Sequence, residues 1–178
     1  MNALHSLDAL INPFRSAVPL FTKAVHLPQA VTPEPYAGLL VHHEHMTVAM
    51  ENFHKDRVDV EVLDRHLEGP ILYRKIILRC STSGVVVQFG LVRFDLRTVS
   101  QQVRDEIMAE QTPLGRILIN HNLLRHVDLN AILELKLGEE LAALMEVPAG
   151  TTTYGRLATL FCDHQPAVDL LEVSRPLG

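Results

Sequence analysis

The sequence has no tryptophan, and only 5% of its 178 residues are aromatic. The core must therefore be aliphatic, drawn from a hydrophobic content of 47%. Cysteine is also scarce: Cys80 and Cys162 lie far apart and form no CxxC pair. Neither a zinc framework nor a disulfide scaffold is expected, and both thiols are interpreted as buried and inert. A chain of this length buries enough surface to fold without such support.

The sequence also lacks a basic excess and long apolar runs. Its 16 Lys and Arg against 21 Asp and Glu give a net charge of −5. Because nucleic-acid binding needs a basic surface, we expect no nucleic-acid partner, although one local arginine could still bind a small anion. No signal peptide is indicated, and no apolar run approaches the roughly 20 residues needed to span a bilayer. We therefore expect a cytoplasmic protein with no membrane partner.

Residues 1–35 carry weak patterning and several prolines. The stretch ALHSLDALINPF is typical of a short amphipathic helix. Three prolines within residues 27–35 favour an extended connector. We interpret residues 1–35 as an N-terminal arm packed on a single domain, which residues 36–178 form.

The rest of the chain alternates blocks of strands and helices. Apolar residues at three- and four-residue steps from Tyr36 to Phe53 predict one helix, with His43 and Met46 on its inward side. Period-two patterns and short turns predict antiparallel strands over residues 57–67, 71–80, 85–96, 126–137, 152–162 and 167–176. Helices are predicted over residues 100–110, 113–122 and 138–146. The order favours an α+β fold, a six-stranded antiparallel sheet with helices packed on one side.

Period-two counting places two charges on apolar strand faces. Arg74 shares a face with Leu72, Ile76 and Leu78, and Glu172 shares one with Leu170. An unpaired charge in such a place is costly. One interpretation is that Arg74 and Glu172 are structural ions, paired with each other or with polar neighbours. The other is a pocket in which the arginine binds an anion and the carboxyl group, its pKa raised by apolar surroundings, donates a proton or a hydrogen bond.

The histidine cluster raises the question of a metal. His42 and His45 are three residues apart, but a metal would need a third ligand from elsewhere, and no HExxH motif is present. We expect no metal site, with His42 and His45 solvated and His43 packed or lining a pocket. The segment from Thr112 to Arg116 is either a simple helix start or a flap over a ligand. No glycine-rich phosphate loop occurs, and no cofactor is expected.

Several segments together resemble the chorismate lyase family. They are His45-Met46-Thr47, the strand YRKIIL that contains Arg74, Gly90, the segment TPLGRIL followed by Arg125, the Tyr154-Gly155-Arg156 strand, and the closing LLEV that contains Glu172. The resemblance covers about residues 38–176, as judged from one sequence. It implies a six-stranded antiparallel sheet and a carbon–oxygen lyase that splits chorismate into pyruvate and 4-hydroxybenzoate without metal or cofactor.

The resemblance also implies roles for individual residues. Arg74 would hold the ring carboxylate, Glu172 would face the ring hydroxyl, and Met46 and Leu114, with Gly115 beside it, would line and cover the site. Arg156 is a candidate for the second carboxylate. The catalytic candidates are thus Arg74 and Glu172, and the substrate-binding set adds Arg156, Met46, Leu114, Gly115 and His43.

Departures from the family pattern keep alternatives open. Lys75 stands where the better-known lyases have Glu, Leu91-Val92 replaces an Arg-Thr pair, and residues 137–150 resemble an insertion. The product could therefore be 3-hydroxybenzoate. The same fold also serves as the effector domain of transcription regulators, so the alternative is a non-catalytic sensor of an aromatic carboxylate. We expect no helix-turn-helix before the domain, because 35 proline-interrupted residues are too few. A third option is an interaction protein with a vestigial pocket.

Overall fold

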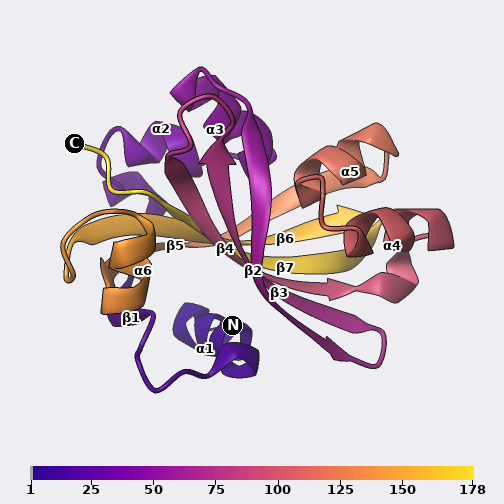
Figure 1. Cartoon of the computed structure of the whole chain (residues 1–178), viewed down its shortest axis with the longest axis horizontal. Coiled ribbons are helices and arrows are strands. Elements are labelled where there is room, and N and C mark those ends of the chain that lie inside the picture. The colour runs from indigo at the N-terminus through magenta and orange to yellow at the C-terminus, as the bar shows by residue number, and fades with distance from the viewer. Residues whose placement is uncertain (1) are drawn as a thin grey trace.

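The computed structural model describes residues 2–178, except for the side chains of Leu124 and Arg125. Its centre is an antiparallel sheet of seven strands in the order β1-β5-β6-β7-β4-β3-β2, with helices against it (Figure 1). The strands are β1 (Phe21–Leu27), β2 (Val58–Glu68), β3 (Ile71–Cys80), β4 (Val86–Asp95), β5 (Leu124–Leu137), β6 (Thr152–Cys162) and β7 (Gln165–Ser174). The predicted α+β class is confirmed, with seven strands instead of six.

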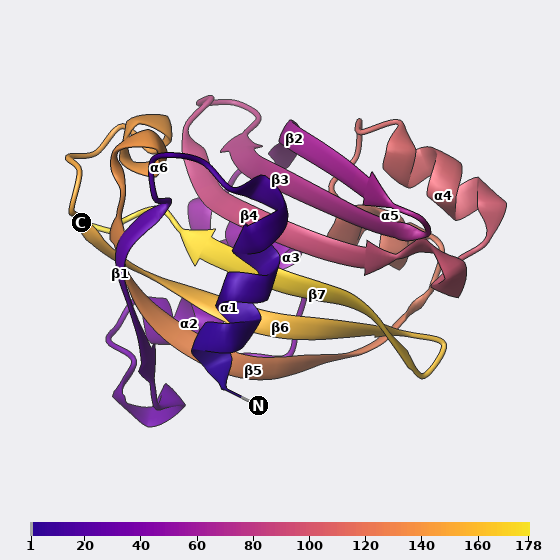
Figure 2. The same cartoon turned by 90° about the horizontal axis from the view of Figure 1, so that it is seen from below.

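The helices lie on the two faces of this sheet (Figures 1 and 2). One face, called here the α3 face, carries α2 (Tyr36–Leu40), α3 (Met46–His54), α4 (Gln101–Met108) and α5 (Leu114–Asn120). The other, the α1 face, carries α1 (Ala3–Ile11) and α6 (Glu139–Leu144). In the part of the chain that is described, no helix is both long and apolar enough to cross a membrane.

The additional strand comes from the N-terminal segment. β1 pairs antiparallel with β5, from Phe21 opposite Leu137 to Leu27 opposite Ile132. The period-two count missed it because FTKAVHL alternates poorly, as is common for a short edge strand. Before β1, the buried Leu7 of α1 packs in one apolar cluster with residues of the sheet. The division into an arm, 1–35, and a domain, 36–178, stays a proposal.

The predicted helix from Tyr36 to Phe53 is broken, and the prediction of one continuous helix is wrong. α2 ends at Leu40, and α3 begins at Met46 after the extended residue His45. Between them, the carbonyls of His42 and Glu44 accept hydrogen bonds from the side chain of Arg156, at 3.0 and 2.9 Å. A continuous helix would direct such carbonyls at its own amides, so the contact with Arg156 is compatible only with the break.

Local signals elsewhere agree with the structure. Ser100 caps α4 by accepting a hydrogen bond from the amide of Val103. Asp163 and His164 join β6 to β7 with φ of 47° and 66°, the left-handed pair of a tight hairpin turn. Cys80 and Cys162 are both buried, as predicted.

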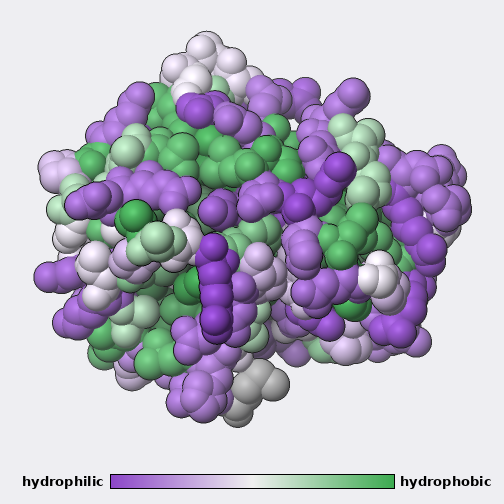
Figure 3. All heavy atoms as spheres, turned by 60° about the horizontal axis from the view of Figure 1, so that its bottom comes forward, coloured by the Kyte–Doolittle hydropathy of each residue, from purple (hydrophilic) through white to green (hydrophobic). Residues whose placement is uncertain are grey.

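The alternation of β3 divides its side chains between the two faces. Arg74 and Ile76 lie on the α3 face, whereas Lys75 and Ile77 point to the α1 face. Lys75 Nζ lies 3.8 Å from a Glu140 carboxylate oxygen on α6. Figure 3 views the molecule from the α1 side, where hydrophilic side chains are interspersed with apolar areas. The enclosed space described below lies on the opposite, α3 face.

Candidate functional site

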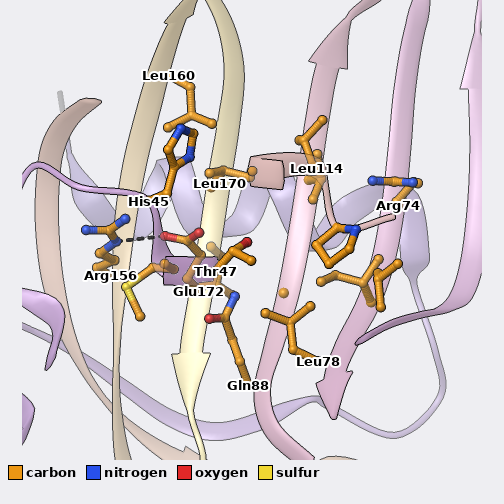
Figure 4. Close-up of a pocket in the computed structure, with 18 residues that line it drawn as sticks. His45, Thr47, Arg74, Leu78, Gln88, Leu114, Arg156, Leu160, Leu170 and Glu172 are labelled. Carbon is orange, nitrogen blue, oxygen red and sulfur yellow. Dashed lines mark hydrogen bonds and ion pairs between the residues drawn. The ribbon is translucent and has the colours of Figure 1, made fainter. Parts of the chain in front are cut away.

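A small cavity lies between the centre of the sheet and the beginnings of α3 and α5 (Figure 4). Its volume is about 40 Å³, enough for a few water molecules. Its walls are largely apolar, with a few polar groups among them. The lining residues are His45, Met46, Thr47, Val60, Arg74, Ile76, Leu78, Gln88, Gly90, Val92, Pro113, Leu114, Gly115, Arg156, Leu160, Leu170, Leu171 and Glu172.

Strand register explains why these groups meet. Ile76, Gly90, Glu172 and Arg156 stand opposite one another across β3, β4, β7 and β6. The row therefore holds a residue without a side chain at its centre. A Cβ atom at Gly90 would lie 3.1 Å from Ile76 Cγ1, tighter than ordinary contact. The missing side chain makes room for the side chain of Ile76, and all four residues of the row line the cavity above the middle of the sheet.

Arg74 is buried without a matching anion. Its side chain is 1% exposed. Its one hydrogen bond to a described residue runs from Nη1 to the Ile107 carbonyl at 3.3 Å, and Nε has no partner. Burial lowers the pKa of Arg74, an effect that the nearby Glu110 carboxylate opposes. Arginine still stays protonated in proteins, so a charged guanidinium is buried here with Nε lacking any partner among the described residues.

Arg156, in contrast, is fully engaged. Its guanidinium is 0% exposed, and Nε donates to Glu172 Oε2 at 2.7 Å. Its two terminal nitrogens donate to the carbonyls of His42 and Glu44. Glu172 therefore pairs with Arg156, and Arg74 lies on the opposite side of the site with Leu114 between them (Figure 4).

The cavity also contains two polar residues whose place in it the sequence patterns did not predict. His45 was expected to be solvated, and this prediction is wrong, because His45 lines the cavity; Gln88 was not considered. His45 Nε2 and Gln88 Oε1 are buried and have no hydrogen-bond partner among the described residues. Burial lowers the pKa of His45 to about 4, and the positive charges of Arg156 and Arg116 act in the same direction. Gln88 could have been found, because it shares a face of β4 with Gly90 and Val92. His45 could not, because its position depends on the break between α2 and α3.

The remaining predicted site residues occupy different places. Met46, Leu114 and Gly115 line the cavity. His43 is exposed, its Nδ1 lies 2.8 Å from the Val127 carbonyl, and it is not part of the lining. A Cβ at Gly115 would lie only 2.8 Å from Thr47 Oγ1, so the starts of α3 and α5 are in close contact. The side chain of Arg125 lies outside the described residues.

No metal-ligating cluster accompanies the cavity. Within residues 2–178, leaving aside the side chains at 124 and 125, no group of three or more His, Cys, Asp or Glu is placed to hold a metal ion. The chemistry that the described groups offer is hydrogen bonding and the binding of an anion.

No known protein family matches the sequence, and no curated protein matches it. Solved structures do share its fold. PhnF from Mycobacterium smegmatis matches with a TM-score of 0.59 at 12% identity, over 76% of this chain and 65% of that one. The effector domain of PhnF matches with 0.58 at 13%, over 74% and 88%. A GntR-family transcriptional regulator from Enterococcus faecalis V583 matches with 0.51 at 14%, over 65% and 92%.

This chain spans only part of some of these proteins. It covers 65% of PhnF and 58% of YydK from Bacillus subtilis, which is described as a possible transcriptional regulator. It covers 88% of the isolated PhnF effector domain. Identities this low show a common fold and nothing finer.

The prediction of a carbon–oxygen lyase of the chorismate pyruvate-lyase type is wrong. Solved structures that share the fold include a possible transcriptional regulator, PhnF with its effector domain, and a GntR-family transcriptional regulator. The predicted cleavage of chorismate to pyruvate therefore has no support. The expected absence of a nucleic-acid partner is likewise unsupported, since regulators act on nucleic acid. The chain has the fold of regulator effector domains.

Proposed function

We propose that this chain is a non-catalytic sensor domain that binds a small organic anion, with an aromatic carboxylate as the first candidate. The observation that carries the proposal is Arg74, a buried guanidinium that lines a cavity and lacks a carboxylate partner among the described residues. Structural arginines of this depth are normally paired, as Arg156 is in the same cavity.

The surroundings of Arg74 suit such a ligand. A guanidinium presents a planar fork of donors, which matches the two oxygens of a carboxylate. Ile76, Val92 and Leu170 supply apolar walls that would pack on a ring. On binding, the carboxylate of the ligand would leave water and form charge-assisted hydrogen bonds with Arg74. Arg74 would then no longer be a buried charge without a partner.

The size of the cavity supports sensing over passive storage. At about 40 Å³ it cannot hold an aromatic acid until lining groups move. The nearest cover is the segment between α4 and α5 together with the start of α5, since Pro113 and Leu114 line the cavity from there, and we propose that this cover moves when the ligand binds. Glu110 lies in this segment, and its Oε1 accepts a hydrogen bond from Arg65 Nη1 at 2.9 Å on the surface. A ligand that binds only the opened form shifts the population toward it, which is the physical content of a sensor.

A sensor needs a recipient of its signal. The fold is that of regulator effector domains, and this chain spans 65% of PhnF. We propose that a further domain or protein, one that contacts nucleic acid, binds the opened and closed forms of this domain with different affinities. The acidic net charge of the chain is compatible with that division of labour, because the sensor need not itself touch the nucleic acid.

Calorimetric titration tests the proposal. The purified chain is titrated with benzoate, 3-hydroxybenzoate and 4-hydroxybenzoate, and binding of at least one acid is expected at submillimolar to millimolar concentration. Arg74→Met should weaken that binding by at least tenfold. Arg79→Met is the matched control, since Arg79 lies on the same strand but pairs with Glu61 at the surface. Wild-type affinity in Arg74→Met, or the absence of binding by all three acids, would overturn the proposal.

A further inference from the structure

A second and much larger hollow lies on the α1 face of the sheet, on the opposite side from the cavity that Arg74 lines. Its volume is about 650 Å³, within the range of about 300–1,000 Å³ that is usual for small-molecule sites. Helix α1 lies across β6 and β7 beside it (Figure 2), and Ser6 and Ala9 line it with side chains too short to fill it. Ala131 and Leu157 form an apolar floor. This hollow is called here the α1 groove.

A row of polar residues on four neighbouring strands also lines the α1 groove. Arg93 on β4 stands opposite Asp169 on β7, and Asp169 stands opposite Thr159 on β6. Thr159 Oγ1 donates to Asp169 Oδ1 at 3.0 Å, and Asn130 Nδ2 on β5 donates to Thr159 Oγ1 at 2.8 Å. This chain of hydrogen bonds holds the Asp169 carboxylate in place and leaves its Oδ2 on the side of Arg93.

Arg93 and Asp169 lie close together but are only loosely paired. Arg93 Nη1 and Asp169 Oδ2 are 3.5 Å apart, whereas a charge-assisted hydrogen bond measures about 2.7–2.9 Å. The side chains are 39% and 48% exposed, and an exposed ion pair of this kind stabilises a fold very little. The next acid along β4, Asp95, is already paired with Arg97 at 2.6 Å. A ligand can therefore replace the contact between Arg93 and Asp169 at small cost.

Two opposite charges side by side select a particular kind of ligand. A simple anion bound to Arg93 would lie beside the Asp169 carboxylate, and a simple cation bound to Asp169 would lie beside the guanidinium. A free α-amino acid carries a carboxylate and an ammonium group on one carbon atom. It can place the carboxylate on Arg93 and the ammonium on Asp169 at the same time. Its side chain would then lie on the apolar floor of Ala131 and Leu157.

We propose that the α1 groove binds a free α-amino acid with an apolar side chain, and that Arg93 and Asp169 bind its two charged groups. The sheet separates this site from the cavity of Arg74, with Leu170 bordering both. The two sites can thus be occupied independently, and this proposal does not depend on the proposed sensor function.

The test uses three ligands that share an indole ring. L-Tryptophan carries both charges, indole-3-propionate carries only the carboxylate, and tryptamine carries only the ammonium. The chain contains no tryptophan, so the indole fluorescence of the ligand reports binding without an indole signal from the protein. We expect L-tryptophan to bind at least tenfold more tightly than either analogue, because each analogue leaves one of the two ions without a partner. Calorimetry with L-leucine provides a second amino acid.

Each variant should remove the recognition of one charge. Arg93→Gln should weaken the binding of L-tryptophan at least tenfold without weakening that of tryptamine. Asp169→Asn should weaken L-tryptophan to a similar degree without weakening indole-3-propionate. Arg97→Gln is the matched control, because Arg97 is an exposed arginine that pairs with Asp95 and does not line the groove. Arg74→Met should bind L-tryptophan as the wild type does, because Arg74 lies on the other face of the sheet.

Several results would overturn the proposal. They are equal binding of L-tryptophan and its analogues, wild-type affinity in Arg93→Gln or in Asp169→Asn, and no binding of either amino acid. A loss of L-tryptophan binding in Arg74→Met would place the ligand in the other cavity and would also overturn it. The urea midpoint of unfolding should stay close to the wild-type value in Arg93→Gln and Asp169→Asn. A large decrease would show that the pair is structural, against the proposal.

Discussion

Arg156 and Glu172 stand directly opposite each other on β6 and β7, and Arg156 Nε donates to Glu172 Oε2 at 2.7 Å. The same guanidinium holds the carbonyls of His42 and Glu44. One side chain thus ties the ion pair under the cavity to the loop that separates α2 from α3. The pair is buried, with side-chain exposures of 0% and 10%, so removal of one partner leaves the other charge without compensation.

We predict that Glu172→Leu lowers the free energy of unfolding by about 3–5 kcal/mol, because it strands a buried charge. Arg156→Met should cost as much or more, since it also releases the loop carbonyls. The double variant should cost clearly less than the sum of the two. Urea denaturation measures all three.

The control for these variants is the exposed pair of Arg79 with Glu61. Arg79→Met should cost less than about 1 kcal/mol, as exposed ion pairs do. A cost for Glu172→Leu that is no larger than this control would show that the buried pair has no structural importance.

Arg74 should behave in the opposite way. It is buried without a carboxylate partner among the described residues, so its charge is a net cost to the unliganded fold. Arg74→Met is predicted to increase the free energy of unfolding by about 1–2 kcal/mol, because an apolar side chain of similar length suits these surroundings better. The same variant should lose anion binding. A destabilised Arg74→Met protein would instead assign Arg74 a structural role.

Gly115 is predicted to be sensitive to a single added methyl group. A Cβ at this position would lie 2.8 Å from Thr47 Oγ1 and 3.2 Å from His45 Nδ1. Gly115→Ala should therefore force the starts of α3 and α5 apart and cost about 1–3 kcal/mol of stability. Thermal or urea unfolding measures the change.

Two further variants check the cause of this effect. Gly38→Ala, in α2, would meet only Glu34 Oε2 at an ordinary 3.5 Å. It should stabilise the protein by about 0.5–1 kcal/mol, as alanine usually does in a helix. Thr47→Ala should recover part of the loss in a Gly115→Ala background, because it removes the clashing oxygen. No recovery would place the clash elsewhere.

His45 should make stability depend on pH. Its pKa is lowered from an ordinary value of 6.5 to about 4, so between these values the unfolded chain binds more protons than the folded one. The free energy of unfolding therefore rises as pH increases from about 4 to about 6.5, by about 1–3 kcal/mol from this residue. Above that range the contribution is constant. Urea unfolding at a series of pH values measures the slope.

The variant His45→Gln should reduce this slope without abolishing it. Burial also lowers the pKa of His42 and of His54, and both contribute with the same sign. The control is His43→Gln, because His43 is an exposed residue of the same loop. The free energy of unfolding should depend on pH more steeply in His43→Gln than in His45→Gln. Equal slopes in the two variants would contradict the assignment.

Much of the fold was predictable because its signals are local. Strand alternation, the Ser100 cap and the tight turn at Asp163 and His164 depend on neighbouring residues only. The break between α2 and α3 was not predictable, since Arg156 holds its carbonyls from 112 and 114 residues away along the chain. Strand β1 was missed for a similar reason, because an edge strand is defined by its pairing with β5 more than by its own pattern.

The site divides in the same way. Period-two counting marked Arg74 and Glu172 as charges on apolar faces, and their exposures are 1% and 8%. It could not decide which of them has a partner. That depends on strand order, since β4 separates β3 from β7 and puts Glu172 beside Arg156 instead of Arg74.

The sequence by itself determined an α+β chain with an aliphatic core, because it has too few aromatic residues for an aromatic core and too few cysteines for a disulfide scaffold. It also determined that one arginine must be placed where burial is costly. Only the tertiary structure decided that this arginine lacks a partner while Arg156 has several. The physical reason is that the cost of a buried charge depends on what surrounds it in space, and strands distant in the sequence supply those surroundings.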